Sequence, residues 1–183
     1  MFKVLHSREK SHSIKVVHRK EDMDKLEISL ISQDTSVYDK NYSIPLVDID
    51  NDLMLIPSME YQADITFPSA VFSTLIDQMK MFGETLSLKC SEEGVEMSSQ
   101  SQECGKMFMN IPIDDLNAFA IEEDEILDMA FSLLHLKNFC MFGKMSKEVD
   151  INLKHGFPIK LVYTLDHNDA RAMFYLAPKL PDE

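Results

Sequence analysis

The stretch YQADITFPSAVFSTLIDQMKMF, residues 61–82, changes its hydrophobic period from two to about 3.6 near its centre. Tyr61 to Phe67 alternates apolar and polar residues, which predicts a half-buried strand. Pro68-Ser69 is a typical helix start, and six apolar residues follow at helical spacing: Val71, Phe72, Leu75, Ile76, Met79 and Phe82. Gly83 ends the pattern. The stretch therefore predicts a strand followed directly by a helix.

Strands are predicted on the C-terminal side of this helix, at residues 85–90, 94–99 and 106–111, with a turn at Glu92-Glu93-Gly94. A similar order returns later in the chain. Asp128 is in position to cap a helix that runs to about Phe142. Alternating strands are expected after it, at residues 149–153, 158–164 and 170–177. One supersecondary unit is thus predicted to occur twice.

A shortened copy of this unit is predicted in residues 1–47. Residues 1–8 have the pattern of a helix end, and strands are expected at 13–19, 25–31 and 37–47. Strand–helix–three-strand units therefore repeat at a period of roughly 65 residues, and the first lacks its leading strand. Because such units bury an apolar face only by pairing with neighbours, a truncated set implies that a part is missing or is supplied by another chain.

The segment from Asp48 to Met59 separates the first copy from the second. It begins acidic, becomes apolar and is flanked by Pro45 and Pro57, which is typical of an interdomain connector. The predicted division is half of a first domain in residues 1–47, a connector in 48–60 and a second domain in 61–183.

The composition predicts a globular, acidic protein. Of its 183 residues 45% are hydrophobic, and the net charge is −13. The charge is uneven, because residues 1–20 carry six Lys or Arg against Glu9 alone, a local charge of +5. A basic end on an acidic body can contact a phosphate backbone there and repel it elsewhere.

The three cysteines, Cys90, Cys104 and Cys140, have no CxxC spacing, which favours a reducing compartment over a disulfide framework or zinc site. The chain has no apolar run of membrane-spanning length, and its N-terminus lacks the pattern of a signal peptide. We therefore expect a soluble, intracellular protein.

Three polar clusters are candidates for metal or catalytic sites. Asp48-x-Asp50-x-Asp52 has Leu53 and Met59 where a calcium loop needs Gly and Glu. His6, His12 and His18 recur every six residues, which suits neither one helix face nor a zinc site. Asp166 to Asp169 has the character of a polar hairpin loop. With no nucleophile setting and no glycine-rich phosphate loop, the sequence predicts no metal, no cofactor and no enzyme activity.

The C-terminal residues FYLAPKLPDE, 174–183, end an apolar run abruptly. Pro178 and Pro181 have no N–H to donate to a sheet, so the strand must stop and leave an extended tail that carries Leu180. The connector is a second apolar segment bounded by prolines. Two such segments are what a peptide-docking groove requires.

The tail Tyr175-Leu176-Ala177-Pro178-Lys179-Leu180, Ile56-Pro57 before Tyr61, and the repeated unit resemble the sliding clamps of the proliferating cell nuclear antigen family. The resemblance covers essentially the whole chain. It implies an α+β sliding-clamp (processivity) fold of β-α-β-β-β units with helices on the inner face of the sheets. It further implies a homotrimer that closes as a ring around duplex DNA, located in the nucleus or at a viral replication site.

The resemblance also implies site residues. The pocket for partner peptides from DNA polymerase, flap nuclease, ligase and clamp loader would use Met54, Ile56, Pro57, Phe157, Pro158, Tyr175, Ala177, Pro178 and Leu180. The residues facing DNA would be Lys3, His6, Lys80, Lys137, Lys144 and Lys147. The strand at residues 37–47 of one subunit would pair with the strand at 106–111 of the next.

The sequence departs from the family pattern in three respects. Met1 aligns inside the family's first domain, whose opening part includes a central loop that completes the docking pocket. Thr74 and Asp77 stand where the family places arginines, which leaves Lys80 as the only cation of that helix. Glu92 stands in place of the family's ubiquitin-accepting lysine.

The resulting hypothesis is a non-enzymatic DNA sliding-clamp subunit, a processivity factor that tethers replication and repair proteins to duplex DNA. A checkpoint-type subunit of a heterotrimeric clamp is one alternative. A stand-alone peptide-binding module without DNA encirclement is another, and a hydrolase or nucleotide-binding enzyme is the weakest.

Overall fold

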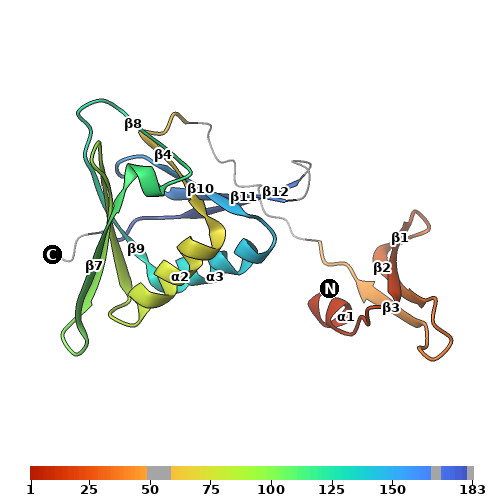
Figure 1. Ribbon diagram of the computed structural model, residues 1–183. Helices are drawn as coiled ribbons and strands as arrows, with labels where there is room; N and C mark the ends of the chain where they lie inside the picture. Colours follow the sequence, from red (N-terminus) through yellow and green to blue (C-terminus); the bar gives the residue numbers. More distant parts are fainter. Residues whose placement is uncertain (49–58, 166–169, 181–183) are drawn as a thin grey trace. The chain divides into compact units, whose positions relative to one another are not determined.

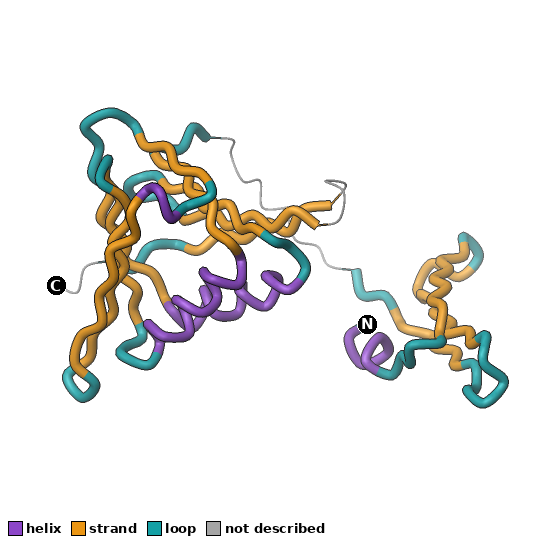
Figure 2. Tube along the Cα trace, in the orientation of Figure 1, coloured by secondary structure: helices purple, strands orange, loops and turns teal. Residues whose placement is uncertain are grey.

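Strands make up most of the computed structural model, which describes residues 1–48, 59–165 and 170–180 (Figures 1 and 2). The chain forms two units, Met1–Ile56 and Pro57–Glu183. Unit 1 contains α1 (Phe2–His6), β1 (His12–Arg19), β2 (Asp22–Ser32) and β3 (Lys40–Pro45). Its strands form one antiparallel sheet in the order β1-β2-β3.

Unit 2 repeats a strand–helix–three-strand arrangement. Its first half contains β4 (Ala63–Pro68), α2 (Ser69–Lys80), β5 (Thr85–Ser91), β6 (Gly94–Ser101) and β7 (Gly105–Pro112). A short link holds the 3₁₀ turn η1 (Ile113–Asp115) and β8 (Ala118–Ile121). The second half contains β9 (Leu127–Ser132), α3 (Leu133–Cys140), the 3₁₀ turn η2 (Met141–Lys144), β10 (Glu148–Leu153), β11 (Ile159–Leu165) and β12 (Ala170–Leu176).

The two halves of unit 2 exchange their leading strands. β4 pairs with β10 of the second half, in the sheet ordered β12-β11-β10-β4-β8. β9 pairs with β5 of the first half, in the sheet ordered β7-β6-β5-β9. The two helices lie side by side (Figure 1). Apolar residues of both sheets and both helices consequently form one buried core, which includes Ile65, Ile76, Leu86, Phe131, Leu136 and Leu161. The predicted α+β class and the repeated unit are thus confirmed.

The predicted helix from Asp128 to Phe142 is wrong in its first part. Residues 127–132 form β9, and α3 begins only at Leu133. Leu127, Met129 and Phe131 alternate with polar or small residues and are all buried against the core. Asp128 is therefore a residue on the outer face of a strand, opposite Lys89 of β5, and not a helix cap.

Other differences concern boundaries and one missed strand. β8 was not predicted, although it pairs with β4 at the sheet edge. The strand predicted from residue 37 begins at Lys40, because Val37 donates its N–H to Asp34 in a turn. The helices α1 and α2 end two residues earlier than predicted.

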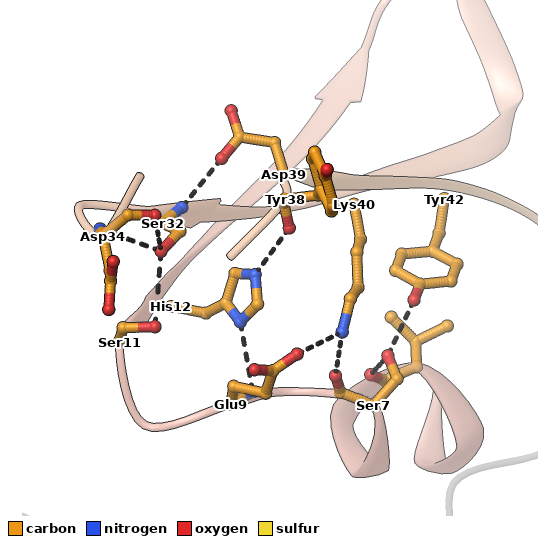
Figure 3. A network of polar contacts seen from close by, with 11 residues as sticks. Ser7, Glu9, Ser11, His12, Ser32, Asp34, Tyr38, Asp39, Lys40 and Tyr42 are labelled. Atoms are coloured by element: carbon orange, nitrogen blue, oxygen red, sulfur yellow. Dashed lines mark hydrogen bonds and ion pairs between the residues drawn. The ribbon is translucent and has the colours of Figure 1, made fainter. Parts of the chain in front are cut away.

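Unit 1 has a small apolar core, formed by Val4 of α1 and by Ile28 and Leu30 of β2. A polar network ties α1 and the following loop to the sheet (Figure 3). The Ser7 hydroxyl bonds to the Val4 carbonyl oxygen and to the Tyr42 hydroxyl, both at 2.7 Å. Because unit 1 buries few apolar residues, these polar contacts are a large part of what fixes α1 on the sheet.

His12 and Lys40 form the centre of this network. The buried His12 ring accepts the N–H of Glu9 at Nδ1 over 3.1 Å and donates from Nε2 to the Tyr38 carbonyl over 3.0 Å (Figure 3). The Lys40 Nζ donates to the Ser7 carbonyl at 3.0 Å and to Glu9 Oε1 at 2.8 Å. The hydrogen bond and charge of Lys40 lower the pKa of Glu9 below its ordinary value of 4.5.

Glu9→Gln should lower the stability of unit 1 in a pH-dependent manner. A carboxyl whose pKa is lowered by folding stabilises the fold above its unfolded pKa and loses that contribution as the pH falls through its folded pKa. We expect a slightly lower midpoint for thermal unfolding of unit 1 at neutral pH, as for other exposed ion pairs. The difference from the unchanged chain should disappear when the pH falls well below 4.5. NMR signals from β1 and β2 report this midpoint.

Glu21→Gln is the matched control, since it removes the same charge at an exposed position near the β1–β2 hairpin. Equal, pH-independent midpoints for Glu9→Gln and Glu21→Gln would contradict a stabilising role for the Glu9–Lys40 pair.

Candidate partner-binding and DNA-facing surfaces

One end of the strand pair β11–β12 lies where β11 begins and β12 stops. The last residue pair at this end is Ile159 with Leu176, and the pair before it is Lys160 with Tyr175. Pro158 and Pro178 flank this end and have no N–H with which to extend the ladder. The chain therefore leaves the sheet here, and its side chains become available at the surface.

Alternation along β12 directs its aromatic residues to opposite faces. Phe174 points into the core, where its ring centroid lies 4.7 Å from that of Phe139 and 4.8 Å from that of Phe142. Tyr175, the next residue, lies on the outer face with its cross-strand neighbour Lys160. Packing of α3 and η2 on Phe174 therefore fixes which way Tyr175 points.

Aromatic rings and lysines gather at this end of the sheet. The Lys160 Nζ lies 5.3 Å from the centroid of the Tyr61 ring, and the Lys154 Nζ lies 5.3 Å from that of Phe157. Burial raises the pKa of Tyr61, and nearby Tyr175 and Asp64 add to this shift. We call Tyr61, Phe157, Lys160 and Tyr175 the aromatic end of the sheet.

The tail after β12 is held against the second sheet. The Lys179 N–H donates to the Ala130 carbonyl of β9 over 2.7 Å, and its Nζ donates to the Thr85 hydroxyl over 2.6 Å. Leu180 is nevertheless 85% exposed, and Phe157 is 43% exposed. The tail is thus anchored through its backbone and one lysine while it presents an apolar side chain to solvent.

The helix surface of unit 2 carries few free positive charges. The Lys and Arg residues of α2, α3 and η2 are Lys80, Lys137 and Lys144. Lys137 of α3 is paired with Asp77 of α2, which neutralises it. The same elements, together with the C-cap residue of α2, expose apolar side chains: Val71, Met81, Leu134 and Met141. This surface is therefore only weakly attractive to a phosphate backbone.

Comparison with known proteins identifies the family. Residues 55–179 match the profile described as "Proliferating cell nuclear antigen, C-terminal domain". Over 147 residues, 78% of this chain, the sequence is 31% identical to proliferating cell nuclear antigen from Chaetomium thermophilum. The chain belongs to the proliferating cell nuclear antigen family. It spans little more than half the length of that relative, 56% of which is covered.

Membership of the proliferating cell nuclear antigen family confirms the resemblance inferred from the sequence and the α+β sliding-clamp fold. Of the nine residues predicted to bind partner peptides, the structure places six at or beside the aromatic end and the tail: Phe157, Pro158, Tyr175, Ala177, Pro178 and Leu180. Met54, Ile56 and Pro57 lie outside the described residues. The role of these residues stays a prediction.

Two residues of the aromatic end, Tyr61 and Lys160, were not predicted as site residues. Their contact depends on the order of β4, β10 and β11 in the sheet, since Asn152 of β10 lies opposite both Asp64 and Lys160. The sequence signal that could have found Lys160 is its outward position in an alternating strand next to Pro158.

The residues predicted to face DNA fall on separate elements. Lys80 ends α2, Lys144 ends η2, and Lys147 lies exposed just before β10. Lys3 and His6 belong to α1 of unit 1, where the His6 ring stacks on that of Phe2 at 5.7 Å. Contact of these residues with DNA stays a prediction for this family member.

None of the polar clusters considered as metal sites forms one within the described residues. Residues 1–48, 59–165 and 170–180 contain no group of three His, Cys, Asp or Glu side chains arranged to hold a metal ion. Asp50, Asp52 and residues 166–169 belong to the segments that are not described. Across the same three ranges, no helix has both the length and the apolar character needed to span a membrane.

The two buried cysteines are poor nucleophiles. Burial raises the pKa of Cys90 to about 12 and that of Cys140 to about 11, so both thiols are protonated at neutral pH. Cys104 is exposed in the turn between β6 and β7 and is not paired in a disulfide.

Proposed function

We propose that this chain is a subunit of a DNA sliding clamp, a processivity factor that keeps polymerases and repair enzymes on duplex DNA. The observation that carries the proposal is the family match over residues 55–179 together with the strand–helix–three-strand repeat. The clamp acts without catalysis. The comparisons favour neither a checkpoint-type clamp nor a stand-alone peptide-binding module.

Retention on DNA in this proposal is topological. Three subunits close head to tail, with the edge strand β3 of one subunit pairing with the edge strand β7 of the next. The helices face the duplex, and their weak charge suits a ring that slides without reading bases. The place of action would be the nucleus or a viral replication site.

Partner proteins would bind at the aromatic end and the tail. A short apolar-aromatic peptide would pack on Phe157, Tyr175 and Leu180 and on the two prolines beside them. The family resemblance adds the connector residues Met54, Ile56 and Pro57, which lie outside the described residues, to the expected peptide contacts. Polymerase, flap nuclease, ligase and clamp loader are the partners we expect.

Encirclement predicts that retention depends on the ends of the DNA. The chain should thread onto a linear duplex attached to a surface at one end and should stay there after the other end is blocked with streptavidin. It should dissociate at least tenfold faster when that end is left open. Surface-detected dissociation at moderate salt measures both rates. Equal rates on blocked and open duplexes would overturn encirclement.

Asp77→Asn should strengthen contact with DNA, because it frees Lys137 from its ion pair. Each additional lysine on a phosphate steepens the dependence of log K on log salt by about 0.9. Fluorescence anisotropy with a labelled duplex at several salt concentrations measures this slope. Asp114→Asn in η1 is the matched control, as it removes the same charge at an exposed position outside the helices. Identical slopes for both variants would show that Lys137 does not contact DNA.

Tyr175→Ala should weaken binding of a fluorescent clamp-interaction peptide by about tenfold, the loss typical of an aromatic side chain at the centre of an interface. Met173→Ala is the control, because Met173 lies on the same face of β12, two residues away, and is also exposed. A tenfold loss in both variants would indicate general damage to β12. No loss in either would remove Tyr175 from the docking surface.

A further inference from the structure

A hollow of about 450 Å³ lies on unit 2 where α2 ends. It is lined by the end of α2 with the link to β5, by the β6–β7 turn, by the start of α3 and by the tail. Met81 and Leu134 line it and are 65% and 54% exposed. Phe82 and Cys104 add further apolar surface. The hollow therefore presents apolar side chains that are open to solvent.

Backbone contacts fix the shape of the hollow. The Leu133 N–H donates to the Glu84 carbonyl over 3.0 Å, which joins the start of α3 to the link before β5. Gly83 lies so close to β6 that a Cβ there would meet the Gln100 carbonyl oxygen at 2.5 Å. Because these contacts join the walls to one another, the hollow belongs to the packed structure of unit 2.

The tail connects the hollow with the aromatic end of the sheet. Leu176 ends β12 next to Tyr175, and Lys179 lines the hollow. Three residues of extended chain span at most about 11 Å. The Lys179 N–H bond to the Ala130 carbonyl holds the tail in this position. A peptide that packs on the aromatic end and the tail therefore needs only about four further residues to reach the hollow.

The charged groups at the hollow are two lysines and one carboxylate. Lys80 and Lys179 line it together with Glu84, which gives a local charge of 2 − 1 = +1, against −13 for the whole chain. The Lys179 Nζ donates to the uncharged Thr85 hydroxyl. Neither lysine forms an ion pair with a residue that the structure describes. An acidic group beside an apolar one fits this combination better than a basic group does.

We propose that the hollow binds the flank of a partner peptide in which an apolar side chain stands next to an acidic residue. The core of that peptide occupies the aromatic end and the tail, so this inference rests on the proposed function. The apolar side chain packs on Met81 and Leu134, and the carboxylate lies near Lys80 and Lys179. The hollow thus discriminates among partners that share one core motif, through the residues beside that motif.

The test compares fluorescent peptides that share one clamp-interaction core and differ in the flank. One flank is Gly/Ser only, the second contains a glutamate and a leucine, and the third contains a lysine and a leucine. Each flank is placed at either end of the core. At one of the two ends, the glutamate flank should tighten binding about fivefold over the Gly/Ser flank, as partial burial of one apolar side chain predicts. It should also bind more tightly than the lysine flank. Fluorescence anisotropy measures the affinities.

Substitutions that remove an apolar contact locate the effect. Leu134→Gln should abolish most of the gain from the glutamate flank and leave the affinity for the Gly/Ser peptide unchanged. Val71→Gln is the matched control, because Val71 is a similarly exposed apolar residue, on α2, that does not line the hollow.

Substitutions that change the charge should act in opposite directions. Lys80→Gln should reduce the gain from the glutamate flank, and Glu84→Gln should increase it, because Glu84 repels the acidic flank. Lys89→Gln is the control, since Lys89 is an exposed lysine on β5 that does not line the hollow.

Cys104 gives a second readout within the hollow itself. It is exposed and lines the hollow, whereas Cys90 and Cys140 are buried. At ten times its Kd, the glutamate-flank peptide should slow alkylation of Cys104 by iodoacetamide about tenfold, because mass action leaves about a tenth of the sites free. The Gly/Ser peptide at the same occupancy should leave the alkylation rate unchanged.

The outcomes separate this proposal from the proposed function. Equal affinities for the glutamate and Gly/Ser flanks at both ends would overturn the proposal and leave peptide docking intact. Failure of every peptide to bind would overturn both. An equal gain in the Leu134→Gln and Val71→Gln chains, or equal protection of Cys104 by the two flanks, would place the flank outside the hollow and overturn the proposal alone.

Discussion

The exchange of leading strands between the two halves of unit 2 is the constraint on which the rest of the domain depends. β4 and β9 are separated by their own helices from the three strands that follow them, and each completes the sheet of the opposite half. Neither half could bury its helix and its apolar sheet face alone. The two halves therefore share one core that includes both sheets. This core determines where the surface residues of unit 2 lie.

Through strand register, packing in the core also determines which side chains lie on the outer surface. Because side chains alternate along a strand, fixing Phe174 against Phe139 and Phe142 also fixes Tyr175 on the opposite face. A slip of one residue would bury Tyr175 and expose Phe174. The prolines at 158 and 178 end the ladder at this point, so the aromatic end and the tail meet at a position set by core packing.

Helices and strands are predictable from the sequence where local signals are unambiguous, but contacts between residues that are distant in sequence are not. Pro68 marks the boundary between β4 and α2, and both were predicted within two residues. No Pro or Gly separates β9 from α3, so the sequence pattern predicts a helix that starts too early and includes the residues of β9. The pairing of Asp77 with Lys137 joins two helices 60 residues apart, and the contact of Tyr61 with Lys160 depends on strand order. Periodicity shows which face a residue occupies but not which residue it meets there.

The same constraint explains why the two units differ in the number of residues that they bury. Among the described residues, the buried core of unit 2 contains 26 residues, whereas that of unit 1 contains Val4, Ile28 and Leu30. Half-exposed Ile14 and Val16 each leave about 1 kcal/mol of burial free energy unrealised. Polar contacts through His12 and Lys40 hold α1 in place. They cannot replace the free energy of that burial, because each hydrogen bond formed on folding replaces one that the same group makes with water.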